Sequence, residues 1–144
     1  MKVVELRLID RDSFSKSIFK GTLESARQKN ICVAYSNECY ELWLLLHFKN
    51  LPSFITRENI KKELNIEFQK NFKLKYEKSE KYVYGMLIDR QKSAIERARK
   101  LIENIINIDG VLNPYDNNPS TKLHILVECL NSLKDCQNND YKCN

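Results

Sequence analysis

Residues 4–12 decide the fold and read Val4-Glu5-Leu6-Arg7-Leu8-Ile9-Asp10-Arg11-Asp12. The apolar residues alternate with charged ones, and this period of two predicts a strand that ends at Ile9 and buries one face more than the other. The strand brings Asp10 to its carboxyl end. Two aspartates therefore flank an arginine at the point where an extended segment opens into a loop.

The residues after this stretch predict a helix and then a second strand. Ser13 can cap the helix, and small or apolar residues recur at every fourth position from Phe14 to Ala26, until Asn30 closes the segment. Residues 31–35 form a short apolar run with strand propensity. The order strand, helix, strand favours a right-handed crossover and a parallel pair. We therefore expect an α/β protein with a Rossmann-like parallel sheet.

Two helices and an irregular segment are expected next. Ser36 or Asn37 can cap a helix over residues 40–48, which is apolar nearly all round and therefore typical of a buried element. A hydrophobic staple predicts that another helix begins at Thr56. Lysines and aromatic residues interleave over residues 67–84 without a clean period, so we interpret that segment as a loop or an irregular insertion.

The remaining sequence predicts two more helices. An apolar stripe indicates a helix that starts near residue 86 or 88 and continues to Ile105. Asn118 followed by Pro119 is typical of a helix start, so we expect the last helix to begin there. We predict one domain over residues 1–136 and a disordered tail over residues 137–144.

The composition is that of one folded domain. The chain has 144 residues, of which 42% are hydrophobic, enough for a single core. Its apolar run Leu42–Leu46 is far shorter than the roughly 20 residues that a membrane span needs. The N-terminal residues are charged and do not resemble a signal peptide. We therefore expect a cytoplasmic protein without a membrane partner.

Cysteines and charges narrow the function only slightly. The five cysteines are odd in number and form no C-x-x-C pair, which argues against a zinc knuckle and a disulfide framework, so we expect reduced thiols. The net charge of +5 is compatible with nucleic acid. Lysines concentrate between Lys61 and Lys81, where glutamates offset much of their charge. This stretch is either ordinary surface, the simpler interpretation, or a phosphate-binding patch.

Asp10 and Asp12 are the first candidate site. Ligands of parallel α/β sheets gather at the carboxyl ends of strands. Two carboxylates one residue apart after an extended segment can share a hard cation such as Mg²⁺, which prefers oxygen ligands. The alternative is structural, with Asp10 ending the strand and Asp12 helping to cap the helix.

Glu41 belongs to a second candidate site, because its helix also follows a strand and both loops can face one cleft. It shares a helical stripe with Leu45 and Phe48 and is therefore expected to be partly buried. A buried carboxylate needs a partner. Glu41 either satisfies backbone donors or pairs with an arginine, or it takes part in binding a metal or activating water.

Several other kinds of site are excluded or disfavoured. His47 and His124 lack a cysteine or second histidine at metal-ligand spacing and are interpreted as packed or surface residues. There is no Walker loop, no G-x-S-x-G elbow and no glycine-rich phosphate cradle among only three glycines. A haloacid-dehalogenase-like phosphatase is also disfavoured, because Ser13-Phe14 does not match the residues that follow its acidic pair.

Four stretches together resemble the RloB-like proteins, which are linked to abortive phage resistance. The resemblance runs from about Val3 to Leu133, and its most specific part is the long central block. The stretches are Leu8-Ile9-Asp10-Arg11-Asp12, Val33-Ala34-Tyr35-Ser36-Asn37-Glu38-Cys39-Tyr40-Glu41-Leu42-Trp43-Leu44-Leu45-Leu46-His47-Phe48, Tyr76-Glu77-Lys78 and Asn118-Pro119-Ser120-Thr121.

The resemblance implies a function. The family is similar to TOPRIM-type nucleases and is usually found beside an SMC-like or AAA-type ATPase. It therefore implies a TOPRIM-like sheet, a Mg²⁺- or Mn²⁺-dependent nuclease that acts on DNA or RNA, and an ATPase partner. Asp10 and Asp12 match the pair expected to bind the metal. Asn37, Glu41 and His47 match the central block and Lys78 the tyrosine-x-lysine piece, which makes Glu41 a catalytic candidate and the other three substrate-binding candidates.

One departure from the family pattern leaves alternatives open. TOPRIM-like domains carry a further glutamate after an earlier strand, whereas only nine residues precede Asp10 here. The βα portion that would supply this glutamate is thus expected to be lacking. The chain is then a fragment, an inactive homologue that serves as a protein- or nucleic-acid-binding subunit, or a version in which Glu38 or Glu41 substitutes. The first two predict an uncovered sheet edge, and hence a homo-oligomer or a partner that covers it.

Overall fold

A parallel pair of strands joined by a helix forms the N-terminal part of the protein. The computed structural model describes residues 5–132. Strand β1 (Leu6–Asp10) leads through helix α1 (Lys16–Gln28) to strand β2 (Cys32–Asn37), and the two strands pair in parallel from Leu6 opposite Cys32 to Asp10 opposite Ser36. The predicted α/β class and the parallel pair are confirmed. The predicted start of the first strand, Val4, lies outside the described residues.

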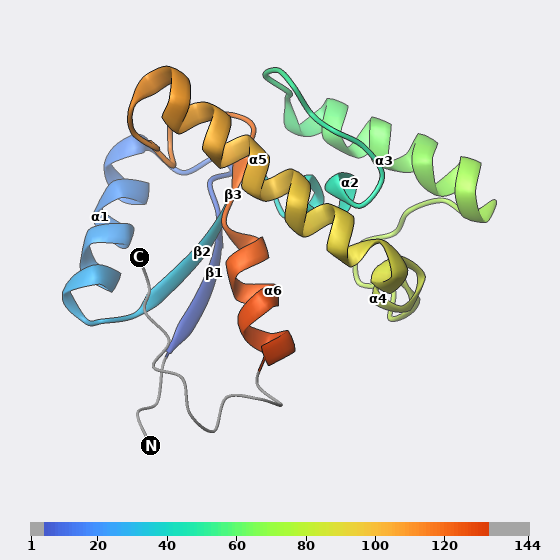
Figure 1. Ribbon diagram of the computed structural model, residues 1–144, viewed down its shortest axis with the longest axis horizontal. Helices are drawn as coiled ribbons and strands as arrows, with labels where there is room; N and C mark the ends of the chain where they lie inside the picture. The colour runs from blue at the N-terminus through green and yellow to red at the C-terminus, as the bar shows by residue number, and fades with distance from the viewer. Residues whose placement is uncertain (1–4, 133–144) are drawn as a thin grey trace.

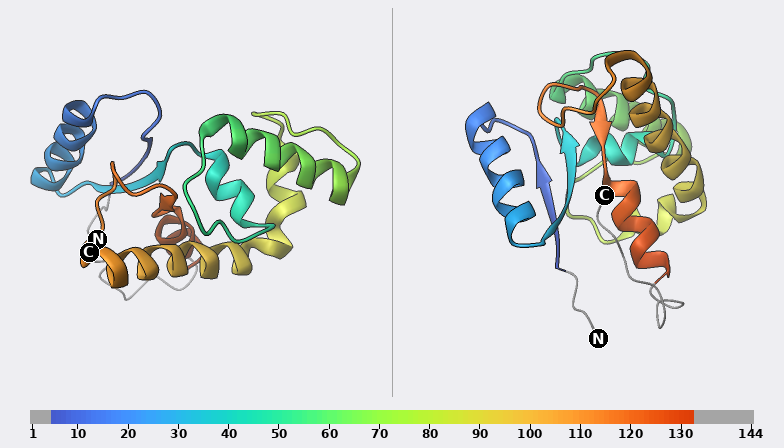
Figure 2. Two further views of the ribbon diagram at one scale, coloured as in Figure 1. Left: turned by 90° about the horizontal axis from the view of Figure 1, so that it is seen from above. Right: turned by 60° about the vertical axis from the view of Figure 1, so that its left-hand side comes forward.

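Helices cover both faces of a small sheet, as Figures 1 and 2 show. Helix α1 lies on one face, where Phe19 packs edge-on against Tyr35 of β2. On the other side lie helices α5 (Gln91–Asp109) and α6 (Leu123–Ser132), of which α6 contacts β2. Strand β3 (Ser120–Thr121) adds to the free side of β2 in the antiparallel direction, giving the order β1-β2-β3.

The helical core of the protein is built around α2 (Glu41–Leu46), every residue of which is buried. Helix α2 packs against α3 (Arg57–Phe72) and α5, and the cluster also includes residues of the short helix α4 (Tyr82–Leu87). A 3₁₀ turn over Ile88–Arg90 joins α4 to α5. No described helix is both long and apolar enough to cross a bilayer.

Four predictions of secondary structure are wrong. Ser15, not Ser13, caps α1, where its side chain accepts a hydrogen bond from the Ile18 amide. Helix α3 continues to Phe72 and α4 begins at Tyr82, so much of the segment interpreted as irregular is helical. The buried face of α3, with Phe68 at its end, explains why the helix continues. The last helix begins at Leu123 instead of Pro119, because β3 intervenes. The predicted caps Ser36 and Asn37 belong to β2, and no side chain caps α2.

Strand β1 is less buried than its alternating pattern predicts. None of its five residues is fully buried, and Leu8 is 45% exposed. The reason is its place at the border of the described sheet, where only β2 pairs with it. The expectation of an uncovered sheet edge is therefore met over the described residues. The predicted tail, residues 137–144, lies outside them.

The thiols only partly match the expectation. Cys39 and Cys129 are buried and free. Cys32 is disulfide-bonded, so the prediction of reduced thiols is wrong for that residue. Count and spacing of cysteines do not show which thiols the fold brings together, and this is why the prediction failed there.

Candidate functional site

The loops that follow β1 and β2 lie against each other. The Arg11 amide donates a hydrogen bond to the Ser36 carbonyl at 2.9 Å, and the Asp12 amide donates one to the Glu38 carbonyl at 2.8 Å. The parallel register places the ends of both strands at one edge of the sheet. Acidic residues from two separate stretches therefore meet there, as the sequence predicts.

Glu41 is the most unusual of these residues, because a fully buried carboxylate has no hydrogen bond of standard geometry. It begins the buried helix α2 and is 0% exposed, and neither carboxylate oxygen has a partner at standard hydrogen-bond geometry among the described residues. The Cys39 thiol and the Tyr76 hydroxyl are the nearby groups that can donate to it. Its ion-pair partner is Lys78, whose ammonium lies 3.7 Å from Oε1 and whose side chain is 58% exposed. The structural alternatives considered for Glu41, backbone donors or an arginine, are not what the fold provides.

The charge of Glu41 affects the groups around it. Burial raises the pKa of the Cys39 thiol to about 12, and the nearby Glu41 charge adds to the rise. The pKa of the Tyr76 hydroxyl is raised as well, first by burial and then by Glu41. A thiol and a phenol thus surround the carboxylate in their neutral forms. The charge of Glu41 is left with a single exposed lysine to balance it.

Asp10 lies close to Glu41 and faces the same lysine. Its pKa is raised, chiefly by burial, and the negative charges of Glu41 and Asp12 add to the rise. The Tyr40 backbone amide and the Lys78 charge act in the opposite direction. One buried carboxylate oxygen of Asp10, Oδ1, has no hydrogen-bond partner. We call Asp10 and Glu41 the carboxylate pair, since they offer three buried oxygens without partners.

Asp12, the second member of the predicted metal-binding pair, is engaged by an arginine. Its carboxylate forms an ion pair with Arg57 at the start of α3. The Arg57 amide donates a hydrogen bond to Glu38 Oε2 at 2.7 Å, and Glu38 Oε1 lies 3.7 Å from Arg11. Asp12 and Glu38 therefore tie the strand-end loops to α3. Sequence reasoning missed Arg57, although its position next to the Thr56 cap places it where carboxylates can gather.

Asn37 holds the loop before β3. Its side-chain amide donates hydrogen bonds to the carbonyls of Pro114 at 3.1 Å and Tyr115 at 2.7 Å, and its buried Oδ1 has no partner. The Arg11 guanidinium stacks on the Tyr115 ring at 4.3 Å. The Asn37 amide nitrogen thus holds the loop before β3 in place. Only the amide oxygen of Asn37 is available to a ligand.

Buried hydroxyls join β2 to β3 beneath this loop. Ser36 and Thr121 hydroxyls are 2.8 Å apart, Thr121 also donates to the Tyr35 carbonyl at 2.9 Å, and the Tyr35 hydroxyl donates to Ser120 at 3.1 Å. Every hydroxyl in this set has a partner, as buried polar groups require. The stretch Asn118–Thr121 therefore serves to hold the sheet edge that carries the site.

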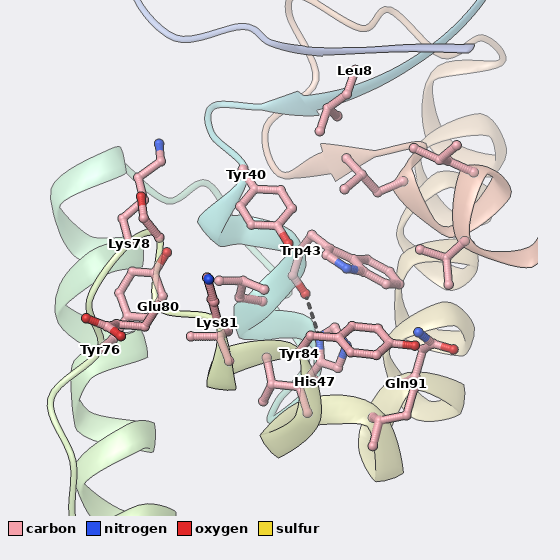
Figure 3. A pocket seen from close by; sticks show the side chains of 18 residues that line it. Leu8, Tyr40, Trp43, His47, Tyr76, Lys78, Glu80, Lys81, Tyr84 and Gln91 are labelled. Atoms are coloured by element: carbon pink, nitrogen blue, oxygen red, sulfur yellow. Dashed lines mark hydrogen bonds between the residues drawn. The ribbon is translucent and has the colours of Figure 1, made fainter. Parts of the chain in front are cut away.

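A groove of about 600 Å³, shown in Figure 3, is lined by residues of α2, α4 and α6 and by the segment before α4. Tyr40 and Lys78, both neighbours of the pair, line it together with His47 of the central block. His47 Nδ1 lies 3.0 Å from the Trp43 carbonyl, and burial lowers the pKa of its imidazole to about 4. Two of the three predicted substrate-binding residues therefore line one groove, and Asn37 does not.

The possible metal ligands at this site are carboxylate oxygens, which favour a hard cation, but they are few. Over residues 5–132, no group of three His, Cys, Asp or Glu side chains is arranged to hold a metal ion. The two members of the carboxylate pair offer oxygen ligands of the kind that Mg²⁺ accepts while it keeps several waters. The buried oxygens without partners fit such an ion, and the ammonium of Lys78 is the positive charge beside them in its absence.

The fold and this edge define an α/β protein with buried carboxylates at the ends of parallel strands. The chain matches the family model described as RloB-like protein over residues 6–130, which is most of its length, and it belongs to that family. No curated protein and no solved structure matches the chain.

Proposed function

We propose that this RloB-like protein is a Mg²⁺- or Mn²⁺-dependent nuclease subunit of a phage-defence system that works with an ATPase. The observation that carries the proposal is the carboxylate pair: Glu41 is fully buried with two unbonded oxygens, and Asp10 adds a third. Natural proteins rarely leave buried polar atoms without partners unless a ligand, an ion or water supplies them. Phage defence and the ATPase rest on the family resemblance.

The residues of the site would have different roles in phosphodiester hydrolysis. Asp10 and Glu41 would hold the metal ion, which when bound polarises the phosphodiester and lowers the pKa of a coordinated water. Lys78, on an exposed side chain, can leave Glu41 and contact a phosphate oxygen. Arg57 pairs with Asp12 and, through its amide, with Glu38, which keeps the two loops together. The charge of the pair, and with it the affinity for a cation, is greatest once Asp10 has lost its proton.

A docking subunit without catalysis is the second candidate. Lys78 already lies beside Glu41, Arg57 already pairs with Asp12, and no three acidic side chains converge in the described part of the chain. An arrangement in which Glu41 and Asp12 each have a cation beside them can persist without metal. In that case the same fold would contact the ATPase or nucleic acid and leave the chemistry to another chain.

The first experiment is a calorimetric titration of the purified protein with Mg²⁺ and Mn²⁺, with plasmid and RNA cleavage measured on the same samples. We expect saturable binding in the natural protein and roughly 100-fold weaker binding in Asp10→Asn, since one of two protein ligands loses its charge. Asp116→Asn is the matched control, because Asp116 is exposed and pairs with Lys16 away from the site.

The outcomes separate the two candidates. Binding together with cleavage that Asp10→Asn removes supports the nuclease, and Asp12→Asn then measures how far the Arg57 ion pair matters. Binding without cleavage supports the docking subunit. If the natural protein binds neither ion, the carboxylate pair is not a metal site and the nuclease proposal fails.

A further inference from the structure

The groove beside the carboxylate pair has aromatic walls. Trp43 of α2, 4% exposed, lies deep in it, and Tyr84 of α4, 66% exposed, lines its outer part. Tyr40 and Tyr76 also line it (Figure 3), and both are neighbours of Glu41. Aromatic rings that are held in place and partly accessible are surfaces on which other flat rings stack.

Hydrogen-bonding groups are placed among these rings. His47 Nδ1 must donate to the Trp43 carbonyl, which only accepts, so the neutral imidazole keeps Nε2 as an acceptor. Gln91 also lines the groove; its amide oxygen accepts a hydrogen bond from Asn131 Nδ2 at 2.8 Å, and its amide nitrogen can donate to a ligand. Aliphatic side chains complete the lining. A flat ligand with donors and acceptors on its edge can use the rings and these hydrogen-bonding groups together, which an aliphatic chain cannot.

The rim of the groove is basic. Lys78 and Lys81 line it and outnumber the single carboxylate of Glu80. Lys78 is also the residue beside Glu41, so the groove and the carboxylate pair share this lysine. A ligand in the groove would therefore carry its negative groups past the lysines and toward the pair.

We propose that this groove binds an unpaired base of a DNA or RNA strand whose backbone passes the carboxylate pair, so that the substrate is single-stranded or locally unpaired. The proposal rests on the nuclease function above and names its substrate class. Every base has a flat face that stacks on an aromatic ring, and such stacking tolerates any sequence. A base inside a duplex is already stacked and paired, and it enters a pocket only after it leaves the helix.

Trp43 is the only tryptophan of the chain and therefore reports on the groove directly. We would titrate the metal-free protein with a short single strand, with an abasic strand of the same length and charge, and with the duplex, in DNA and RNA forms. Tryptophan fluorescence and anisotropy of a labelled strand give the two readouts. Both strands carry the same phosphates, so repulsion from the carboxylate pair cancels in their ratio.

We expect the strand with bases to quench Trp43 and to bind at least about tenfold more tightly than the abasic strand, since one stacked base is worth roughly 5- to 150-fold in affinity. The Tyr84→Ala variant should lose most of this preference. Tyr82→Ala is the matched control, because Tyr82 is also partly exposed on α4 and does not line the groove. The ratio of DNA to RNA affinity shows which strand the protein prefers.

Equal binding of the two single strands, duplex binding as tight as single-strand binding, or no binding of any strand would each overturn the proposal. The last result would leave the groove to a protein partner. Metal binding with cleavage of intact duplex would remove the substrate inference and leave the nuclease function in place. Failure of the metal titration, with base-dependent binding retained, would remove the nuclease function alone.

Discussion

The Glu41→Gln variant is expected to be more stable than the natural protein in metal-free solution, by about 1–3 kcal/mol in the free energy of unfolding. Glutamine keeps the shape of the side chain and removes the charge of a fully buried carboxylate, which has no hydrogen bond of standard geometry and one ammonium 3.7 Å away. The nearby Cys39 thiol and Tyr76 hydroxyl can donate to the glutamine oxygen as well. Most core substitutions destabilise. A gain at this position would mark Glu41 as a residue kept for function.

Urea unfolding with a chelator present measures this difference. Glu63→Gln is the matched control, because Glu63 pairs with Lys49 on the surface and its replacement should change stability by about 0.5 kcal/mol or less. A loss of more than about 1 kcal/mol in Glu41→Gln would show that the carboxylate serves the fold, and the metal site would have to be sought elsewhere.

Adding Mg²⁺ should reverse the order of stability. A ligand at 100 times its Kd stabilises the folded state by about 2.7 kcal/mol, and only the natural protein keeps both members of the carboxylate pair. The variant should gain little. This reversal depends on binding alone and is therefore independent of any cleavage assay, which makes it a test of the metal site even if the protein proves to be a docking subunit.

The sequence predicts the edge of the sheet well because its signals are local. The alternating pattern before Asp10, the helix after it and the apolar run that ends at Tyr35 suffice to place two parallel strands and their loops. Handedness and direction of such a unit follow from backbone sterics. The parallel direction places the carboxyl ends of both strands at one edge of the sheet. The sequence therefore also predicts that Asp10 lies near the loop that leads to Glu41.

The contacts that decide the chemistry are not local, and no pattern in one sequence shows them. Lys78 reaches Glu41 from 37 residues away, and Arg57 pairs with Asp12 from 45 residues away. The lysine and aromatic residues around Tyr84 lack a period because their apolar partners come from several elements. For that reason the sequence pattern does not predict the start of α4, the helix that lines the groove.

The free energy of unfolding is expected to fall by about 2–3 kcal/mol between pH 7 and pH 4.5 because of His47 alone. Burial lowers the pKa of this imidazole from 6.5 to about 4, against the opposing effect of its hydrogen bonds to the Trp43 and Leu44 carbonyls. The charges of Arg97 and Arg90 add smaller lowering effects. The folded protein therefore favours the neutral form of the His47 imidazole.

The sign of the effect follows from proton uptake. Between pH 6.5 and about 4, His47 binds a proton in the unfolded chain but not in the folded protein. The contribution of His47 to stability is therefore fully present above pH 6.5 and is lost as the pH falls through this window. His124, whose pKa is also lowered, adds to the loss. Asp10 acts in the opposite direction, because its raised pKa favours the folded state at low pH.

Urea unfolding of the natural protein and of His47→Gln at pH 7 and pH 4.5 isolates the contribution of His47. The variant lacks the titrating ring and should lose about 2–3 kcal/mol less than the natural protein over this range, whatever its stability at pH 7. His124→Gln should retain most of the loss. An equal pH dependence in the natural protein and His47→Gln would mean that the imidazole accepts a proton without unfolding. His47 would then be exposed to water in solution, and the groove that it lines would be wider than the structure shows.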